Sequence, residues 1–277
     1  MSLEMDGPIT KNLLLQAMEG GINYFDTADL YQHGMNETVV GAAFREKRNR
    51  VILATKVGNQ WRADGSGWDW NPSKKYIMAS IDQSLKRLQT DYIDLYQLHG
   101  GTLQDPIDEM IETFESLKAA GKIRYYGISS IRPNVIRQYV KRSSIVSVMM
   151  QYSLLDRRPE EEMLQYLLDN GVGVLARGVI AKGLLVSKPA AAFLNYSAGD
   201  VEIAANAVRS ISDKFHSPFE TAVQFVLNNP AVTSAVVGIR TAEHLSAAIG
   251  AGRFSLNENQ MDVLSNSLSA NKYTDHR

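Results

Sequence analysis

The amino-acid sequence predicts an α/β protein with the (β/α)8 TIM barrel fold. Short β-type runs alternate with longer helix-type runs along the whole chain, as in parallel βα units. Most of the strand-like runs are continuously apolar, which is typical of strands that are covered on both faces. The chain has 277 residues, close to the size of such barrels, so we expect one domain over residues 1–277.

Seven strand candidates are short runs of mainly apolar residues. They are Ile22–Phe25, Val51–Lys56, Tyr92–Leu98, Tyr125–Ile128, Val146–Met150, Gly173–Ala176 and Ser234–Val237. The remaining strand of the barrel is reduced to the stub Met1–Leu3. We therefore expect strand 1 to be truncated, or its residues to be missing upstream, since a barrel without one strand has unpaired edges.

Helices are predicted where apolar residues recur at helical spacing behind a residue that favours a helix start. One pattern near the N-terminus consists of Ile9, Leu13, Leu14, Ala17 and Met18. Four further starts are marked by Ser73, by Pro106 as the first helical residue after Asp105, by Pro159, and by the capping box Ser217-Pro218-Phe219-Glu220. The helix at Pro159 is expected to direct Met163, Leu164, Leu167 and Leu168 inward.

An open, doubly wound sheet fits the sequence less well. No glycine-rich phosphate-binding turn follows the first strand candidate. The segment Gly171-x-Gly173-x-x-Ala176 matches a dinucleotide fingerprint by its letters. It lies at a helix-to-strand junction, the reverse of the order that the fingerprint requires.

Composition argues against several classes of function. With 29 basic and 30 acidic residues the net charge is -1, so nothing indicates nucleic acid or a membrane surface as a partner. The absence of cysteine excludes disulfides, thiolate catalysis and Cys-ligated zinc. Neither a long apolar run nor a signal-peptide pattern occurs. We expect a cytoplasmic, enzyme-sized protein.

Polar residues stand at the ends of three consecutive strand candidates. Asp26 ends the first, with Tyr31 five residues later, while Lys56 and His99 end the next two. Barrel active sites are built at the carboxyl ends of strands, so these four residues together predict an active site. Taken alone, each has a simpler structural role, such as a helix cap, a packing residue, a solvated strand end or a core histidine.

The flanking residues carry a resemblance to a known family. Asn23–Tyr31 reads Asn-Tyr-Phe-Asp-Thr-Ala-Asp-Leu-Tyr, Ile52–Gly58 reads Ile-Leu-Ala-Thr-Lys-Val-Gly, and Asp91–His99 reads Asp-Tyr-Ile-Asp-Leu-Tyr-Gln-Leu-His. With the spacing of the four polar residues, these segments resemble the aldo-keto reductase superfamily, and the resemblance extends over most of the chain. It implies the reduction of aldehydes and ketones to alcohols by hydride transfer from NADPH, with a small-molecule carbonyl substrate and no metal.

The resemblance also implies a role for each of the four residues. Tyr31 is the general acid, Lys56 makes its phenol more acidic, Asp26 pairs with Lys56, and His99 hydrogen-bonds the carbonyl oxygen. The chemistry is consistent, because a phenol is a weak acid near neutral pH and a neighbouring ammonium stabilises the phenolate. A buried ammonium in turn needs a carboxylate partner.

Contacts to the nicotinamide end of the cofactor are implied at two predicted strand ends. Ser129 and Ser130 after one strand, and Gln151 after the next, are expected to hold the carboxamide. Arg177, followed by Gly178, stands where the family usually has an aromatic residue that stacks on the nicotinamide. A guanidinium is planar and can also stack. Arg177 is expected to favour release of the oxidised cofactor or to reach a phosphate or substrate carboxylate, and the alternative is an arginine turned to solvent.

The segment Val236–Leu245 resembles the family's adenine-end motif and contains Gly238, Arg240 and His244. Thr241 is expected to cap the helix that follows, and free N–H groups at a helix start favour an anion. Arg240 is then expected to bind the 2′-phosphate of NADP, with a plain surface charge as the alternative. The family's usual glutamine is replaced by His244, so NAD stays possible.

Two loops bear on the substrate and the cofactor. Gly58–Trp70 holds all three tryptophans and is expected either to form an apolar wall for aromatic or α-dicarbonyl substrates or to pack as a surface flap. Leu194–Asp200 is expected to be a flexible cover over the cofactor pyrophosphate.

Two other functions remain compatible with the sequence. One is a nicotinamide-binding regulatory subunit with little turnover, similar to the β subunits of potassium channels. The other is a Schiff-base aldolase in which Lys56 is the nucleophile. The sequence does not specify the oligomeric state.

Overall fold

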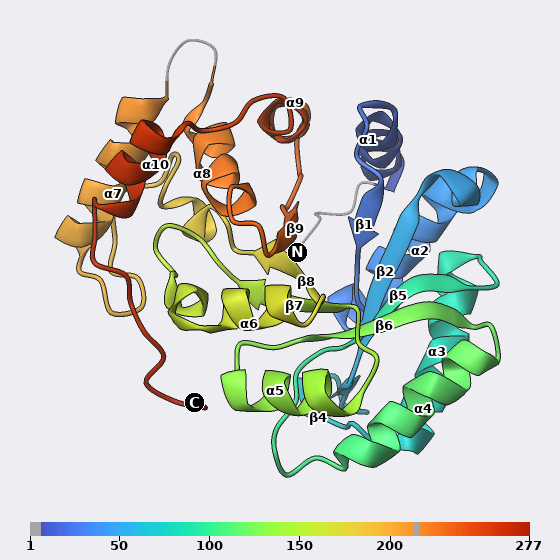
Figure 1. Ribbon diagram of the computed structural model, residues 1–277. Coiled ribbons are helices and arrows are strands. Elements are labelled where there is room, and N and C mark those ends of the chain that lie inside the picture. Colours follow the sequence, from blue (N-terminus) through green and yellow to red (C-terminus); the bar gives the residue numbers. More distant parts are fainter. Residues whose placement is uncertain (1–6, 213–215) are drawn as a thin grey trace. The chain divides into compact units, whose positions relative to one another are not determined.

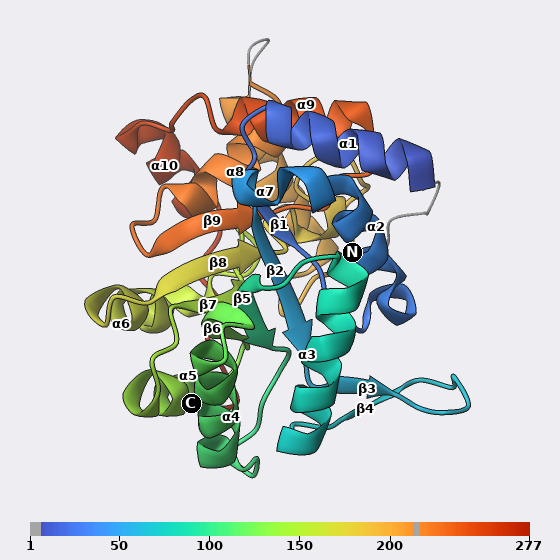
Figure 2. The ribbon, with the colours of Figure 1, turned by 90° about the vertical axis from the view of Figure 1, so that its right-hand side faces the viewer.

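The computed structural model describes residues 7–212 and 216–277 (Figures 1 and 2). The predicted stub strand Met1–Leu3 lies outside the described residues. Packing divides the chain into two compact units. The first runs to Ser130 and includes Asn134–Val148, and the second comprises Ile131–Pro133 and Met149–Arg277.

The first unit alternates parallel strands with helices. Strands β1, β2, β5 and β6 are neighbours in this order, and each pair is parallel. The elements are α1 (Gly7–Glu19), β1 (Tyr24–Asp26), a 3₁₀ turn (Tyr31–Gly34), α2 (Met35–Phe44), a second 3₁₀ segment (Arg45–Arg50), β2 (Ile52–Val57), β3 (Asn59–Trp61), β4 (Trp68–Trp70), α3 (Lys74–Leu88), β5 (Ile93–Leu98), α4 (Ile107–Ala119), β6 (Ile123–Ser129) and α5 (Pro133–Arg142).

The second unit continues the alternation, and its strands β8 and β9 are parallel neighbours. The division between the units falls within β7 (Ser147–Gln151). The later elements are a 3₁₀ turn (Arg158–Glu161), α6 (Met163–Asp169), β8 (Gly173–Arg177), a second 3₁₀ turn (Ala181–Gly183), α7 (Ala198–Ile211), α8 (Pro218–Leu227), β9 (Val232–Val236), α9 (Ala242–Ala251) and α10 (Glu258–Ser265). All seven internal strand candidates are thus present among the described residues. The order of elements and the parallel pairing confirm the predicted fold class, a parallel α/β barrel.

Helix starts follow from the predicted caps. The Ser73 hydroxyl accepts a hydrogen bond from the backbone N–H of Tyr76 at the start of α3. Ser217 and Glu220 form the capping box of α8, in which each side chain accepts from the other residue's N–H. On α3 the apolar residues Ile77, Ile81 and Leu88 are buried, and Ile77 is fully excluded from solvent. Caps and the apolar stripe therefore act together to fix this helix.

Three local predictions were wrong. Pro106 is the N-cap of α4 rather than its first helical residue. Pro159 is the second residue of the 3₁₀ turn Arg158–Glu161, and α6 begins only at Met163 because Glu162, with a φ of -163°, is not helical. Leu168 was expected to face inward but is 40% exposed. The shorter α6 begins four residues later than expected and leaves Leu168 on its outer side.

The segment Leu194–Asp200, expected to be a flexible cover, is held by hydrogen bonds from Tyr196 to its end. The Tyr196 hydroxyl donates to the carbonyl of Ser269 at 2.7 Å. Ser197 and Asp200 form a capping box, so the end of the segment is the first turn of α7. A second feature that we did not predict is the antiparallel pair β3–β4, a hairpin that projects beside the first turn of α3 (Figure 2).

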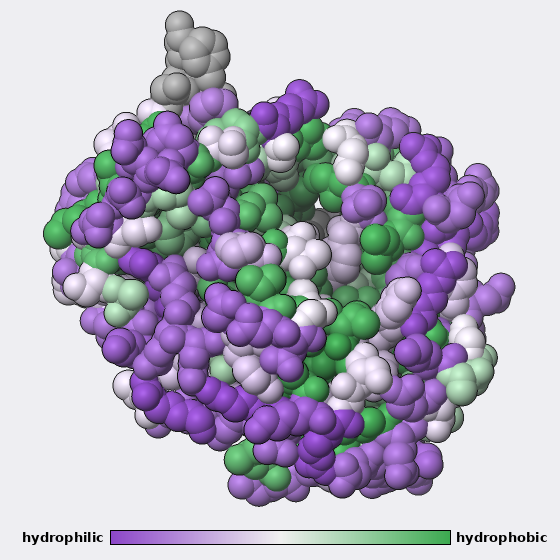
Figure 3. All heavy atoms as spheres, viewed as in Figure 1, coloured by the Kyte–Doolittle hydropathy of each residue, from purple (hydrophilic) through white to green (hydrophobic). Residues whose placement is uncertain are grey.

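Hydrophilic residues make up most of the face shown in Figure 3, with hydrophobic residues in smaller groups between them. Within the described part of the chain, none of the helices is both long and apolar enough to cross a membrane.

Candidate active site

Three neighbouring strands of the first unit bring three of the predicted catalytic residues to one edge. Asp26 is the last residue of β1, Lys56 lies one residue before the end of β2, and His99 follows β5 directly. The strands are parallel, with Asp26 opposite Ala54 and Lys56 opposite Gln97. Because the carboxyl ends of parallel strands meet at the same edge, the register itself gathers these side chains.

Asp26 and Lys56 form a buried ion pair. The Lys56 ammonium donates to Asp26 Oδ2 and also to the backbone carbonyl of Thr27 at 2.8 Å. Only 1% of the Lys56 side chain and 9% of the Asp26 side chain are exposed. The other carboxylate oxygen of Asp26 accepts from Gln97 Nε2 at 3.3 Å. The pair is therefore held by hydrogen bonds on both sides, as a buried charge requires.

Tyr31 and His99 complete the group. The Lys56 Nζ lies 5.2 Å from the centre of the Tyr31 ring. The Tyr31 and His99 rings are 5.9 Å apart and meet edge to face at 80°. The backbone N–H of His99 donates to the carbonyl of Val57 at 2.7 Å, which fixes the end of β5 against β2. The structure thus brings all four predicted residues together.

Two buried acids next to this group were not predicted. Glu37 of α2 is fully buried and accepts from Thr55 Oγ1 at 2.6 Å and from Arg87 Nε at 2.7 Å. Asp29 is 9% exposed, and its Oδ2 accepts from the Tyr76 hydroxyl at 3.1 Å. Burial and, to a smaller extent, the negative charge of Glu37 together raise the pKa of Asp29 to about 7. Nothing in the sequence distinguishes these two carboxylates from exposed ones.

The tryptophan-rich segment is the β3–β4 hairpin, and it is bound to the backbone of His99 and of Leu30, the neighbour of Tyr31. Trp61 Nε1 donates to the carbonyl of Leu30, the residue before Tyr31, at 3.0 Å. Asn59 Nδ2 donates to the carbonyl of His99 at 3.2 Å. The base of the hairpin therefore touches the loop that carries the phenol and the strand end that carries the imidazole.

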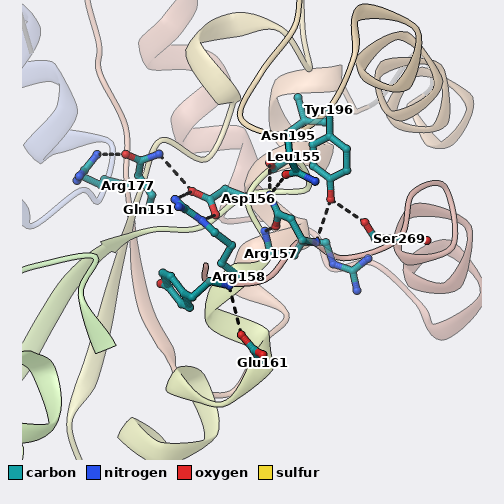
Figure 4. A network of polar contacts seen from close by, with 12 residues as sticks. Gln151, Leu155, Asp156, Arg157, Arg158, Glu161, Arg177, Asn195, Tyr196 and Ser269 are labelled. Carbon is teal, nitrogen blue, oxygen red and sulfur yellow. Dashed lines mark hydrogen bonds and ion pairs between the residues drawn. The ribbon is translucent and has the colours of Figure 1, made fainter. Parts of the chain in front are cut away.

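In the second unit, Gln151 is held between two charged groups (Figure 4). Its Oε1 accepts from Arg177 Nη1 at 3.0 Å, and its Nε2 donates to Asp156 Oδ2 at 3.2 Å. Arg158 in turn binds both carboxylate oxygens of Asp156 at 2.7 Å. Arg177 is thus bound to Gln151 and is not simply turned to solvent. Gly178 follows with a φ of +72°, a conformation that favours glycine.

The remaining predicted cofactor residues lie at a strand end and at a helix start. Ser129 ends β6, and both it and Ser130 are buried in the first unit. In the second unit Gly238, Arg240 and His244 are exposed around the start of α9. The predicted cap is present, since the N–H of His244 donates to the hydroxyl of Thr241 at 3.2 Å.

Comparison with known proteins identifies the family. A model of the family described as "Aldo/keto reductase family" matches residues 3–268. The chain belongs to this family. The resemblance expected from the sequence is thereby confirmed, and the protein is an oxidoreductase of the aldo-keto reductase type.

Several aldo-keto reductases and related oxidoreductases are similar to the chain. "Uncharacterized oxidoreductase YqkF" of Bacillus subtilis is 47% identical over an alignment 287 residues long, which covers 100% of this chain and 93% of that protein. The holo form of aldo-keto reductase AKR11C1 from Bacillus halodurans superposes with a TM-score of 0.93 at 45% identity, covering 100% of this chain and 92% of the other. The "NADH-specific methylglyoxal reductase" of Escherichia coli is 34% identical over 66% of this chain and 60% of that relative.

Proposed function

We propose that the protein reduces aldehydes and ketones to alcohols with NADPH, and that Tyr31 is the proton donor. The observation that carries this proposal is the arrangement of Asp26, Tyr31, Lys56 and His99 in the first unit, in which the buried ammonium lies between a carboxylate and the phenol ring. Its partner is then a small-molecule carbonyl compound. The expected cytoplasmic location and the expected lack of nucleic-acid and membrane partners stay predictions.

Each of the four side chains has a defined task in this proposal. The nicotinamide, when bound, supplies the hydride. The Tyr31 hydroxyl donates its proton to the carbonyl oxygen of the substrate, which becomes the hydroxyl of the alcohol. The Lys56 ammonium stabilises the negative charge left on the phenol, and Asp26 keeps that ammonium in place. His99 donates a hydrogen bond that orients the carbonyl oxygen.

The residues present are compatible with a nicotinamide dinucleotide. Ser129 and Ser130 in the first unit, and Gln151 in the second, each carry hydrogen-bonding groups of the kind that a carboxamide binds. The amide of Gln151 is already oriented, because the cation of Arg177 fixes its oxygen and the carboxylate of Asp156 fixes its nitrogen. Gln151 would thus keep one N–H and one lone pair in a defined direction for this ligand.

The start of α9 suits a phosphate, which favours NADP over NAD. Helix N-termini attract anions, and the exposed guanidinium of Arg240 stands directly before the Thr241 cap. Two observations keep NAD as the second candidate. Glu243 places a carboxylate in the first turn of the same helix, where it would oppose a phosphate. The similar methylglyoxal reductase of Escherichia coli is NADH-specific by name.

The test is the oxidation of NADPH with a panel of small aldehydes, ketones and α-dicarbonyls, by the wild-type protein and by Tyr31→Phe. We expect kcat to fall by at least about a hundredfold in Tyr31→Phe, the lower range for a general acid, while cofactor binding measured by fluorescence is kept. Tyr125→Phe, which changes an exposed tyrosine, is the matched control. Tight cofactor binding without turnover in the wild type would instead support the regulatory-subunit function.

Cofactor preference is tested by Arg240→Ala, with NADPH and NADH compared in parallel. We expect KM for NADPH to rise about tenfold or more and KM for NADH to change little, since only NADPH has the 2′-phosphate. Arg253→Ala, which removes an exposed arginine after the other end of α9, is the control. Equal effects on both cofactors would rule out a 2′-phosphate contact.

A further inference from the structure

Asp29 lies in the short segment that links two of the proposed catalytic residues, Asp26 and Tyr31. Its backbone N–H donates to the carbonyl of Lys56 at 3.3 Å, so this segment is bound directly to β2. Its carboxyl group forms no ion pair among the described residues. Oδ1 is buried and has no hydrogen-bond partner in the described part of the chain, and Oδ2 accepts from the Tyr76 hydroxyl.

The Tyr76 hydroxyl faces two acceptors but has a single hydrogen. It lies 3.1 Å from Asp29 Oδ2 and 3.2 Å from the backbone carbonyl of Asn59. When Asp29 is ionised, the phenol hydrogen is drawn to the carboxylate, and Asn59 loses that donor. When Asp29 carries a proton, its own O–H can donate to the phenol oxygen, and the phenol can then donate to Asn59. The protonation of Asp29 therefore sets the direction of the whole chain of hydrogen bonds.

Asn59 connects this chain to the active site. It is the first residue of β3, and its side-chain amide donates to the carbonyl of His99 at 3.2 Å. Two residues later in β3, Trp61 donates to Leu30, which lies between Asp29 and Tyr31. Three hydrogen bonds, by way of Tyr76 and Asn59, thus connect the carboxyl group of Asp29 to the backbone carbonyl of His99.

Water can reach this chain. Asp29, Asn59 and Tyr76 line a hollow of about 450 Å³ together with Trp61 and other residues of the hairpin and α3. The ionisable groups around Asp29 are Glu37 from α2, Arg87 and Tyr76 from α3, Tyr96 from β5 and His33 from the 3₁₀ turn. Of these, Arg87 is paired with Glu37 rather than with Asp29, so no cation neutralises the buried carboxylate directly.

We propose that Asp29 is a positioning residue whose protonation, transmitted through Tyr76 to Asn59, determines how firmly the β3–β4 hairpin holds the ends of the active site at Tyr31 and His99. The kinetic part of this proposal rests on the reductase function proposed above. In the protonated arrangement the Tyr76 hydroxyl is free to donate to the carbonyl of Asn59, so this arrangement binds the hairpin more firmly. The raised pKa of Asp29 places the change between the two arrangements within the neutral pH range.

The first measurement does not depend on activity. Labelling tryptophan with ¹⁵N gives three indole N–H signals, one for each tryptophan. We expect the Trp61 signal to shift with a midpoint near pH 7, and Asp29→Asn, which mimics the protonated acid, to abolish the shift. His33 stacks on Trp61 with ring centres 3.8 Å apart, so the comparison is made in a His33→Gln background. A Trp61 shift that persists in Asp29→Asn, or no shift in the parent protein, overturns the proposal.

The second measurement is KM for the carbonyl substrate between pH 6 and pH 8.5. We expect KM of the parent protein to rise by roughly fivefold, the factor that corresponds to one ordinary hydrogen bond. Asp29→Asn should keep the low KM at every pH, and Tyr76→Phe should remove the pH step while leaving KM high. Asp64→Asn, at the exposed tip of the hairpin, is the matched control and should retain the step. A change of KM with pH that survives in Asp29→Asn overturns the proposal. If the parent protein shows no turnover, only the reductase function is refuted. The indole signal of Trp61 then tests the role of Asp29 by itself.

Discussion

The replacement Asp29→Asn is expected to stabilise the protein at high pH. The pKa of this carboxyl group is raised from 3.8 to about 7 in the folded state, first by burial and then by the charge of Glu37. A raised acid pKa means that the folded state holds the proton more tightly than the unfolded chain. The associated stability is fully present below the unfolded pKa near 4 and is lost as pH rises through about 7.

The size of the effect follows from the same two pKa values. At ~1.4 kcal/mol for each pKa unit, ionised Asp29 lowers the free energy of unfolding by up to about 4 kcal/mol above pH 8. At pH 5 the cost is only about 1.5 kcal/mol, since the folded state is then still protonated. Asparagine has nearly the same shape, carries no charge and can donate to Tyr76, so it removes this cost at every pH.

Equilibrium urea unfolding, followed by circular dichroism at several pH values from 5 to 8.5, measures the difference. We expect the advantage of Asp29→Asn over the wild type to grow by about 2–3 kcal/mol across this range. Asp64→Asn changes an exposed carboxyl group and should show no such growth. If Asp29→Asn were no more stable than the wild type at pH 8.5, or if its advantage were the same at every pH, the argument from burial would be refuted.

Two further changes test the packing beneath the active site. Arg87→Met leaves the fully buried Glu37 without its cation, so we expect the free energy of unfolding, measured with urea at pH 7, to fall by about 3–5 kcal/mol. Adding Glu37→Gln to the same chain should restore part of this loss. An unchanged unfolding midpoint would contradict the buried pair. Gly41→Ala places a methyl group 2.5 Å from the backbone carbonyl of Arg87, so we expect it to cost about 1–3 kcal/mol. Gly199→Ala is the control, because its methyl group meets nothing closer than 3.7 Å, and it should not destabilise the protein in the same assay. An equal loss of unfolding free energy in both variants would argue against the close contact of α2 with α3.

The strand-end residues of the candidate site could be predicted from the sequence because local patterns determine them. Asp26, Lys56 and His99 each end an apolar run, and parallel strands place such ends on one edge. The position of Tyr31 near them followed from the family resemblance rather than from any pattern of its own. Their gathering in the structure agrees with the prediction.

The buried acids and the hairpin could not be predicted in the same way. Asp29 and Glu37 are buried by helices that lie far away in the sequence, so no local pattern marks them. Each strand of the hairpin has only three residues, too few for a clear alternation of apolar and polar side chains. The late start of α6 depends on the single non-helical residue Glu162, which a helical pattern of apolar residues does not reveal.

The β3–β4 hairpin separates a fixed base from a free tip. At the base, Asn59, Trp61 and Trp70 bind residues outside the hairpin, the last through a 3.0 Å hydrogen bond to Asp105. The tip, residues 62–66, is exposed throughout. Because exposed loop tips tolerate changes of sequence and length at little cost in free energy, new tips can be grafted there while the base keeps its attachments. The hairpin tip is therefore a part of this chain that a combinatorial library can vary while the attachments of the base to His99 and to Leu30 are kept.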